Sequence, residues 1–587
     1  MATAEALKSG ETSGGAFLLD DGAVESIFTP EDLDEEHRAI ARTADEFYAN
    51  EIAPEVNAIQ RQEPGVAPGI LRKSAELGLT GISIPEEYGG MELDLASSLL
   101  TAEHLGRDAS YAAWHGAHTG IGTLPVLYFG TEAQKRKYLP KLASAEMIAA
   151  YALTEPHAGS DALSLRTRAD LTSDGKHYVL NGQKMWITNG GAADLFTVFA
   201  KVNGTDMTAF LVERAFGGVT SGAEEKKMGI KGSSTTAVYF ENVPVPVENV
   251  LGEVGRGHVI AFNILNMGRL SLGALAVGGA KDVLKTSLSY AKERQAFGKA
   301  IGSFGAIQSK LAEMAIRIFA AESVTWRVVG LVQNRLRGFS WSKPDAAKEM
   351  LGTLEEFAAE CSLVKVLGSE VLDFVVDEGL QIHGGYGFHQ DYAVERAYRD
   401  SRINRIFEGT NEINRLVMVG MLLKRAARGQ LALMQAVEWA IAEGKGGAGE
   451  DGSERLVHNA RKIALLAMAL AQRRFKADLE NQQEVMMSLA DILLELFAMQ
   501  STYLRTERLR QAGKGVIAEA VCDVFLRDAM ARIEVAARQV LGACAAGEAL
   551  TAQMSILRKL ARYEPVNAVE LRRSIATHLL ARGQYAL

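Results

Sequence analysis

The chain has 587 residues, which is too long for a single hydrophobic core, so we expect about three or four structural units. Its 63 basic and 72 acidic residues give a net charge of −9, and no local tract of lysine or arginine departs from that balance. This charge argues against a protein that binds nucleic acid.

Cysteine usage and hydropathy further narrow the class of protein and its expected location. The three cysteines, Cys361, Cys522 and Cys544, are scattered without metal-ligand spacing, which predicts buried thiols in a reducing compartment and no metal site. No apolar run approaches the roughly 18 residues of a membrane span. The acidic N-terminus shows neither a signal-peptide core nor an Arg-rich leader, so we expect a cytoplasmic protein.

The first 150 residues divide into an arm and a helical block. Residues 1–30 are interrupted by glycines such as Gly14 and Gly15, so we expect a flexible N-terminal arm. Residues 31–150 predict an α-helical domain, opened by Thr29 as an N-cap and Pro30 in the first turn.

An unusual run of small side chains lies at residues 112–122. Four of them recur at spacings of three and four and therefore share one helical face: Ala113, Gly116, Ala117 and Gly120. Such a face admits either a ligand or a second helix, and the pattern alone does not choose. His115 and His118 lie in the same run without a third ligand, so we expect core or solvated histidines.

Residues 151–254 change to the pattern of short strands. We expect a strand followed by a turn at 176–182, and buried strands at 195–200, 209–212 and 238–244. This predicts a small β domain between two helical blocks.

Helical patterns return after the β domain. Residues 255–430 predict a second α-helical domain, a bundle that contains Glu408. Its amphipathic stretches cover 257–295, 304–336 and 346–379. Residues 431–453 are expected to form a linker, apolar and helical at first and then rich in glycine. Residues 454–587 predict a C-terminal helical domain.

The stretch 405–413 (RIFEGTNEI) carries the strongest chemical signal. Glu408 follows two large apolar residues, and desolvation raises the pKa of such a carboxylate toward the range of a useful base. Gly409 lets a ligand approach the backbone, and Thr410 offers a hydroxyl. An isolated glutamate of this kind is more often a helix cap or an ion-pair partner, so other motifs must decide.

Three other motifs precede it. Residues 151–161 (YALTEPHAGSD) combine hydroxyls and backbone amides in a loop suited to a polar ring edge or a phosphate. Residues 185–191 (MWITNGG) set an aromatic plane beside a hydroxyl, and residues 294–299 (RQAFGK) couple a cation to an aromatic ring. In this order, and with the Glu408 stretch behind them, they closely resemble the acyl-CoA dehydrogenase family over about residues 35–430.

The chain beyond residue 430 resembles one branch of that family. Very-long-chain acyl-CoA dehydrogenases carry an extra C-terminal helical domain, and residues 136–144 (RKYLPKLAS) and 225–231 (EKKMGIK) also look like that branch. The resemblance implies a mostly α fold with a central β-barrel or β-sandwich domain. It also implies an FAD-dependent enzyme that converts long-chain acyl-CoA to trans-2-enoyl-CoA, the first step of fatty acid β-oxidation.

The resemblance assigns roles residue by residue. Glu408 corresponds to the base that removes the α-proton, while hydride passes to FAD and an electron-transferring flavoprotein reoxidises it. Some family members carry the base at the position of Gly268, which cannot act as one here. The expected flavin contacts are Tyr151, Leu153, Thr154, Gly159, Ser160, Trp186, Thr188, Arg294, Phe297, Gln381, Gly385, Thr410 and Glu412. The expected substrate contacts are Ser160, Asn266, Arg269, Phe407, Gly409, Ala113, Gly116, Ala117 and Gly120.

The resemblance to the acyl-CoA dehydrogenase family implies a role for the face of small residues. Medium-chain relatives place longer polar side chains at the positions of Ala113 and Ala117, where they floor the acyl pocket. Without that floor a longer tail is admitted, and each buried methylene contributes about 0.8 kcal/mol. We therefore expect a long-chain preference.

The sequence also leads to expectations about the oligomeric state and leaves two alternative functions open. The resemblance implies a homodimer in which some flavin contacts cross the interface, and it leaves peripheral membrane association open. The nearest alternative is an acyl-CoA oxidase that lets O₂ reach the reduced flavin. A scaffold or assembly protein that keeps the fold is the alternative from a different class.

Overall fold

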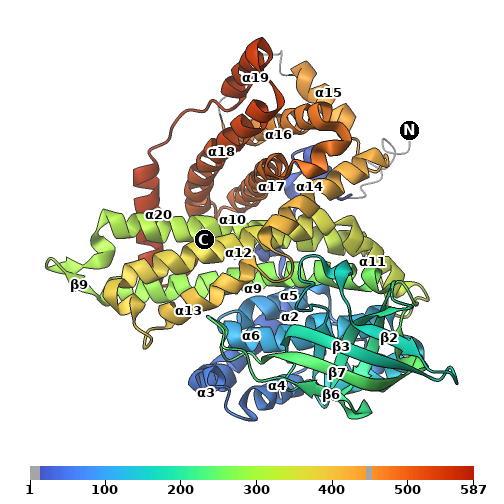
Figure 1. Ribbon diagram of the computed structural model, residues 1–587. Helices are drawn as coiled ribbons and strands as arrows, with labels where there is room; N and C mark the ends of the chain where they lie inside the picture. Colours follow the sequence, from blue (N-terminus) through green and yellow to red (C-terminus); the bar gives the residue numbers. More distant parts are fainter. Residues whose placement is uncertain (1–12, 444–451) are drawn as a thin grey trace.

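The computed structural model describes residues 13–443 and 452–587 and confirms a mostly helical fold around one β domain (Figure 1). The N-terminal helical domain contains α2 (Glu35–Phe47), α3 (Val56–Gln60), α4 (Val66–Glu76), α5 (Leu95–Leu105), α6 (Ala109–Gly116), α7 (Leu124–Phe129) and α8 (Glu132–Ala143). A π-helix, η7 (Ala117–Gly122), extends α6 directly. Such widened turns are rare and are found frequently at functional sites.

The β domain is one twisted sheet in the order β6-β7-β3-β2-β4-β5-β8, with β1 added beside β4. Its strands are β1 (Ala149–Ala152), β2 (Arg168–Leu171), β3 (His177–Thr188), β4 (Leu195–Val202), β5 (Asp206–Glu213), β6 (Val219–Ser221), β7 (Thr235–Pro246) and β8 (Val250–Leu251). Pairing is antiparallel except where β1 and β2 meet β4. Strand β4 is buried on both faces, which explains its continuous apolar sequence.

Of the strand followed by a turn that was expected at 176–182, the strand is confirmed and the turn is wrong. Strand β3 continues through Gly182 to Thr188, and its register against β7 shifts between Leu180 and Gly182 and again between Lys184 and Ile187. A β-carbon at Gly182 would lie 2.5 Å from Thr167 Oγ1, so this position needs glycine where the loop before β2 crosses it. Glycine inside a strand marks a close approach here, not a chain reversal.

The second helical domain contains α9 (Gly257–Glu293), α10 (Gly305–Arg335), α11 (Ala346–Glu356), α12 (Ala358–His383), α13 (Ala393–Ser401) and α14 (Asn411–Ala427). A small hairpin, β9 (Gln295–Ala296) with β10 (Lys299–Ala300), joins α9 to α10 at one tip of the bundle (Figure 1). The expected helices at 257–295, 304–336 and 346–379 are confirmed, and the last is divided into α11 and α12.

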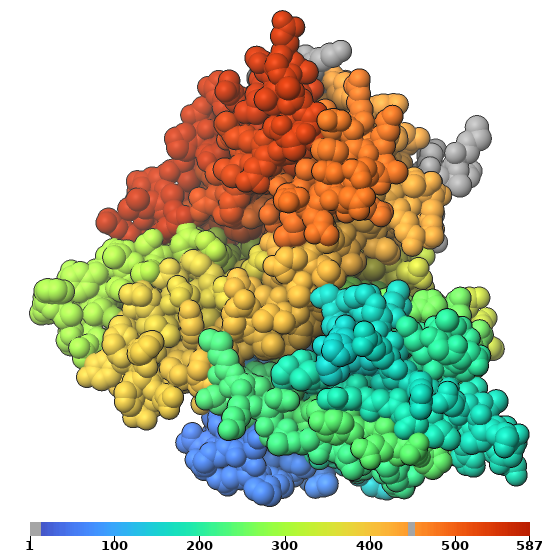
Figure 2. Space-filling model, in the orientation of Figure 1, coloured from blue at the N-terminus to red at the C-terminus, as the bar shows by residue number. Residues whose placement is uncertain are grey.

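The C-terminal domain contains α15 (Leu433–Glu443), α16 (Ser453–Phe475), α17 (Gln483–Gln511), α18 (Val516–Cys544), α19 (Gly547–Leu560) and α20 (Ala568–Arg582). It sits on the second helical domain, on the side away from the sheet (Figures 1 and 2). One hydrophobic core runs through both, because buried residues of α9, α10 and α12 join those of α16, α17 and α18. The glycine-rich part of the expected linker lies outside the described residues, apart from Gly452.

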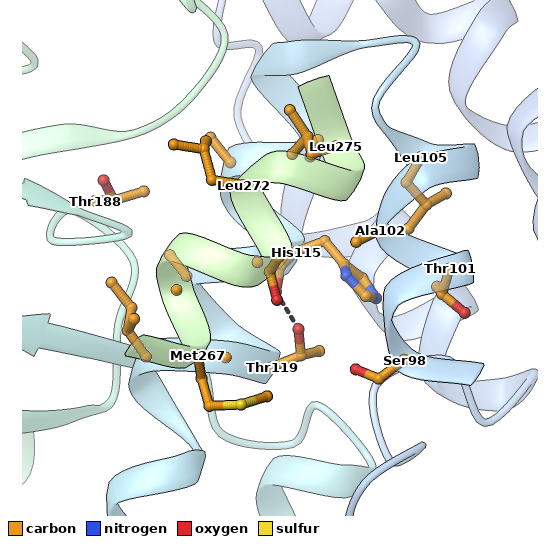
Figure 3. Close-up of a pocket in the computed structure, with 18 of the residues that line it drawn as sticks. Ser98, Thr101, Ala102, Leu105, His115, Thr119, Thr188, Met267, Leu272 and Leu275 are labelled. Carbon is orange, nitrogen blue, oxygen red and sulfur yellow. Dashed lines mark hydrogen bonds between the residues drawn. The ribbon is translucent and has the colours of Figure 1, made fainter. Parts of the chain in front are cut away.

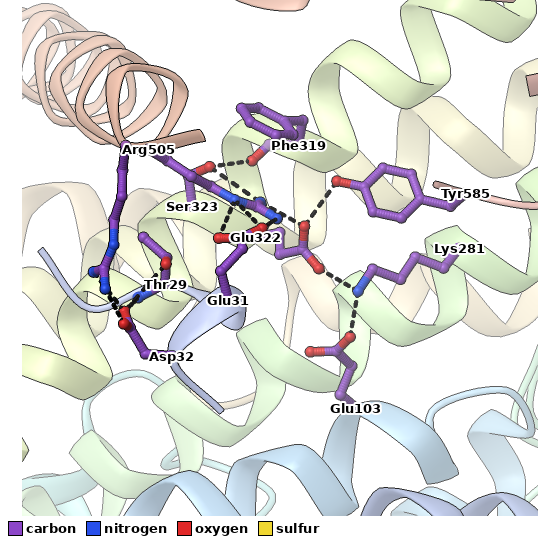
Figure 4. A network of polar contacts seen from close by, with 11 residues as sticks. Thr29, Glu31, Asp32, Glu103, Lys281, Phe319, Glu322, Ser323, Arg505 and Tyr585 are labelled. Atoms are coloured by element: carbon purple, nitrogen blue, oxygen red, sulfur yellow. Dashed lines mark hydrogen bonds and ion pairs between the residues drawn. The ribbon is translucent and has the colours of Figure 1, made fainter. Parts of the chain in front are cut away.

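The expectation of a flexible arm does not hold for residues 13–30. Phe17 and Leu18 are buried in the shared core, and Gln500 of α17 donates to the Phe17 carbonyl at 2.9 Å. The acidic residues that follow reach an ionic cluster (Figure 4), in which Arg505 bridges Glu31 at 2.7 Å and Glu322 at 2.6 Å. This segment therefore fastens the C-terminal domain to α10.

Within residues 13–443 and 452–587, two helices are long and apolar enough to cross a membrane by length and composition, which corrects the expectation that no run approaches that length. They are α9 and α17, and 61% and 83% of their most apolar windows are buried inside the protein. Burial of this extent is that of core helices in a folded domain.

Candidate active site

A cavity of about 160 Å³ lies where the N-terminal helices meet α9 and the turn before α14 (Figure 3). Its walls come from α5, α6, η7 and α9, and Glu408 and Phe407 close one end of it together with Thr188. Leucines and other apolar side chains make up most of the remaining lining. A carboxylate thus faces a pocket shaped for an apolar chain.

Glu408 adopts an uncommon backbone conformation. Its φ of 57° is left-handed, and the following Gly409 has a φ of 82°. Side chains other than glycine, asparagine and aspartate rarely adopt this region, and such strain collects at functional sites. The turn ends where Thr410 caps α14 by accepting from the Ile413 N–H at 3.2 Å.

Three buried polar side chains hold the turn in place, and sequence analysis missed two of them. Asn414 donates to the Gly409 carbonyl at 2.8 Å, and Lys365 donates to the same oxygen at 2.8 Å. Arg269 donates from Nε to the Glu408 carbonyl at 3.3 Å. The sequence did not point to Lys365 or Asn414, because each is recognisable as a support of the turn only from its contact with the Gly409 carbonyl in the folded chain.

The electrostatics of the site suit a base. Oε2 of Glu408 is buried and has no hydrogen-bond partner among the described residues. Burial raises the pKa of this carboxyl to about 6, although the nearby charges of Arg269 and Lys365 lower it. Burial also lowers the pKa of Lys365 to about 7. The Glu408 carboxylate is therefore ionised at neutral pH, and an unpartnered oxygen is ready to take a proton.

The small-residue face lines this pocket. Ala113, Gly116, Ala117 and Gly120 all belong to its wall. A β-carbon added at Gly116 or Gly120 would meet no atom within 4 Å, so open space stands in front of both. The alternative of tight helix–helix packing is therefore wrong for this face.

The two neighbouring histidines behave differently from each other. His118 is a core histidine, because its Nε2 donates to the Leu142 carbonyl at 2.9 Å and its Nδ1 accepts from the Ala149 N–H at 3.1 Å. His115 is also buried, but its Nε2 has no hydrogen-bond partner among the described residues and its ring lines the pocket. No group of three metal-ligating side chains occurs in the described parts of the chain.

Nine of the expected flavin contacts come from β1 and the loop after it, the end of β3 and the start of α14, and of these Thr188 lines the pocket. They are Tyr151, Leu153, Thr154, Gly159, Ser160, Trp186, Thr188, Thr410 and Glu412. Trp186 is 53% exposed and has a φ of 59°, where a β-bulge turns its indole out of the sheet. Burial raises the pKa of Tyr151, and the negative charge of Glu408 adds to that effect.

A buried ion pair supports the loop after β1. Lys184 and Glu155 meet at 2.7 Å, and Lys184 also donates to the Leu153 carbonyl at 3.1 Å. Glu155 accepts from the N–H and hydroxyl of Thr167. This pair fixes the path of the loop. The sequence did not predict it, because nothing in the pattern of strand β3 indicated that the Lys184 side chain points into the protein.

The other four expected flavin contacts lie elsewhere in the chain. Arg294, Phe297, Gln381 and Gly385 gather around the β9–β10 hairpin and the end of α12, at the opposite side of the molecule from the sheet (Figure 1). Arg294 lies over the ring of Tyr386 at 5.3 Å, and Phe297 is 96% exposed. A single chain therefore does not bring the two groups together.

The expected substrate contacts Asn266 and Arg269 stay a prediction, and the structure places both behind the Glu408 turn. Arg269 is 7% exposed, and its guanidinium donates to Asn266 Oδ1 at 3.0 Å as well as to the Glu408 carbonyl. Asn266 is equally buried. All of these bonds lie inside the protein, so the pair supports the backbone of the Glu408 turn.

The residues around Trp186 fit FAD. An exposed indole offers a face for a planar ring, and the backbone at Gly159 is open, because a β-carbon there would meet nothing within 4 Å. The N-terminus of α14, a helix of 17 residues, can accept an anionic group. A carboxylate base together with such a platform is the arrangement expected of a flavin-dependent oxidoreductase.

Comparison with known proteins agrees with this class. Family models described as the N-terminal, middle and C-terminal domains of acyl-CoA dehydrogenase match residues 34–146, 150–243 and 255–423, and a further acyl-CoA dehydrogenase C-terminal model matches residues 459–559. The chain belongs to the acyl-CoA dehydrogenase family, and FAD is its cofactor.

The relatives extend over the additional domain. The chain is 45% identical to a probable acyl-CoA dehydrogenase of Bacillus subtilis across 98% of both chains. It is 40% identical to the bovine mitochondrial very long-chain specific acyl-CoA dehydrogenase, over 78% of this chain and 73% of that protein. An acyl-CoA dehydrogenase from Bacillus anthracis, solved in complex with FAD, is 46% identical and superposes with a TM-score of 0.96 over 98% of this chain and all of that one.

Proposed function

We propose that this enzyme dehydrogenates long-chain acyl-CoA thioesters to trans-2-enoyl-CoA. The observation that carries the proposal is the unpartnered Oε2 of Glu408 at the end of a pocket whose wall is left open by Gly116 and Gly120. The carboxylate supplies the base, and the pocket supplies room for a long apolar tail.

The chain's own groups account for the proton transfer. Glu408 takes the α-proton of the bound thioester on Oε2, and its raised pKa makes the proton transfer more favourable than for an ordinary carboxylate. The backbone N–H of Glu408 donates to no other group in the described part of the chain, so it can donate to the thioester oxygen as negative charge develops there. FAD, when bound, supplies the acceptor for the hydride from the β-carbon.

The positioning groups keep this geometry. Arg269, Lys365 and Asn414 fix the left-handed turn that aims Glu408. Reacting atoms must approach within about 3–3.5 Å, so this support is part of catalysis even though the groups stand behind the base.

We also propose a homodimer. The two groups of flavin-contacting residues lie at opposite sides of one chain, and a second copy would bring the hairpin group to its partner's flavin. Large apolar side chains are exposed there, with Phe297 in the hairpin 96% accessible and Phe388 in the turn after α12 84% accessible. Light scattering that gives a dimer supports this arrangement, and a tetramer refutes it.

The electron acceptor and the location are further proposals. We assign reoxidation to an electron-transferring flavoprotein, in line with the family resemblance, and a cytoplasmic location. All three cysteines are buried and unpaired, as expected in a reducing compartment. Reduction of an added electron-transferring flavoprotein, and recovery of the enzyme in the soluble fraction, test the two assignments.

The function is tested with a panel of saturated acyl-CoAs from butyryl to eicosanoyl. The expected result is formation of trans-2-enoyl-CoA, identified by mass spectrometry, with kcat/KM highest for the long chains and no stoichiometric peroxide in air. A maximum at short chains would overturn the long-chain assignment. Peroxide release would indicate an oxidase, and no turnover of any acyl-CoA would indicate a scaffold protein.

A further inference from the structure

The acyl pocket is not uniformly apolar. Where α5 and α6 meet, its wall carries the hydroxyls of Ser98 and Thr101 and the imidazole of His115 (Figure 3). Leu272 and Leu275 of α9 line the middle of the pocket. Thr188 marks the opposite, catalytic end, so the polar groups lie toward the far end of a bound acyl chain.

His115 is the group that distinguishes this end. His115 is only 7% exposed, and its Nε2 atom is buried without a hydrogen-bond partner in the described part of the chain. His118, three residues later, uses both ring nitrogens. A buried polar atom without a partner is costly, and in native proteins such atoms ordinarily have a partner, which can be bound water or a ligand.

The protonation state limits what the partner can be. Burial lowers the pKa of His115 to about 3, with a smaller effect of His118, and outweighs a hydrogen bond between the ring and the Leu79 backbone that raises it, so the ring is neutral at physiological pH. A neutral imidazole has one donor and one acceptor nitrogen, and a hydroxyl group suits either tautomer because it both donates and accepts. A plain hydrocarbon chain would leave Nε2 without a partner.

We propose that the far end of the pocket recognises a hydroxyl group carried by the acyl chain, through a hydrogen bond to Nε2 of His115. The substrate class then includes hydroxylated long-chain acyl-CoAs. The inference rests on the proposed function, since it requires an acyl chain in this pocket. Thr101 supports it, because its hydroxyl donates to the Ser97 carbonyl at 3.0 Å and keeps its capacity to accept from a second group.

The test compares stearoyl-CoA with a series of hydroxystearoyl-CoAs whose hydroxyl moves along the distal half of the chain. The FAD-loaded enzyme is expected to favour one hydroxyl position over its neighbours. In His115→Leu the ratio of kcat/KM for that substrate to kcat/KM for stearoyl-CoA should fall about 3- to 10-fold, the range of one ordinary hydrogen bond. His115→Gln, which keeps a donor and an acceptor, should restore part of the ratio.

Two outcomes overturn the inference. One is a wild-type penalty for the hydroxyl that is the same at every position. The other is an unchanged ratio in His115→Leu, which would mean that water satisfies Nε2. Thr353→Val is the matched control for the ratio, because its hydroxyl likewise donates to a carbonyl four residues earlier, that of Glu349 at 2.9 Å, but Thr353 does not line the pocket. Failure of stearoyl-CoA itself to react would instead count against the proposed function.

Discussion

Gly268 and Glu408 share one space: a β-carbon built at position 268 would lie 2.6 Å from Oε2 of Glu408 and 3.0 Å from its Cδ. The two residues come from different elements, α9 and the turn before α14, and meet only in the folded protein. The absence of a side chain on α9 therefore makes room for the carboxylate. This gives a steric reason for glycine where other family members carry the base.

Gly268→Ala should slow flavin reduction by about 10-fold or more, since a misplacement of about 1 Å can cost about 100-fold in rate. Helix α9 tolerates alanine well, so the loss should appear in the rate and not in folding. Rapid mixing with palmitoyl-CoA under anaerobic conditions measures the rate. A wild-type rate would show that the carboxylate has room to move.

A double variant separates crowding from loss of the base. Glu408→Gly removes the base, and adding Gly268→Glu returns one carboxylate to the same space from α9. The double variant should reduce its flavin faster than Glu408→Gly alone. If the two are equally slow, the geometry at position 268 cannot support a base in this chain.

The pH dependence should report on Glu408 and on Lys365. Because the base must be ionised, kcat/KM should fall as the pH drops through about 6, the value to which burial raises the pKa of Glu408. The Lys365 charge lowers that pKa, so Lys365→Met should shift the acid limb to higher pH and also reduce kcat. Lys343→Met, at an exposed ion pair with Glu349, is the control and should leave the profile unchanged. An unshifted acid limb in Lys365→Met would contradict this electrostatic role.

Gly120→Leu should shorten the preferred acyl chain. Its side chain would enter open pocket space, and each methylene excluded from the pocket costs about 0.8 kcal/mol, so kcat/KM for palmitoyl-CoA should fall about 10-fold or more. Butyryl-CoA should be much less affected. Gly352→Leu, at another open helical glycine outside the pocket, is the matched control. An unchanged chain-length profile in Gly120→Leu would remove this wall from the acyl site.

Arg505→Met should destabilise the junction between the C-terminal domain and α10. Arg505 is 3% exposed and bridges Glu31 and Glu322, and breaking such a buried pair costs about 3–5 kcal/mol. Arg510→Met removes an exposed pair with Glu507 and should leave the melting temperature nearly unchanged. Thermal unfolding of both variants makes the comparison, and equal shifts would mean that the buried cluster contributes little.

Much of the site was predictable because catalysis restricts residue types at fixed positions. Glu408 stood out by its apolar neighbours and by Gly409, and the small residues of α6 and η7 stood out by their spacing. The fold class followed from the same motifs and from the change between helical and strand patterns. The sequence could not decide whether Gly116 and Gly120 face a ligand or a packed helix, and the open space in front of them in the folded protein decided it.

The remaining features depend on contacts between distant segments. The Lys184–Glu155 pair and the support of the Glu408 turn by Lys365 join residues far apart in sequence, and no local pattern encodes such partners. Arg269 carries the charge expected near CoA, but its neighbours turn it toward the base. The glycines before Phe17 predicted flexibility, whereas burial of that ring in the C-terminal domain orders the segment.

Anaerobic titration of the FAD-loaded enzyme with palmitoyl-CoA, with Glu408→Gln beside the wild type, tests whether Glu408 is the base for acyl-CoA dehydrogenation. The long-wavelength flavin absorbance should bleach in the wild type, whereas Glu408→Gln should bind palmitoyl-CoA without bleaching. Bleaching of Glu408→Gln at the wild-type rate would show that another group is the base.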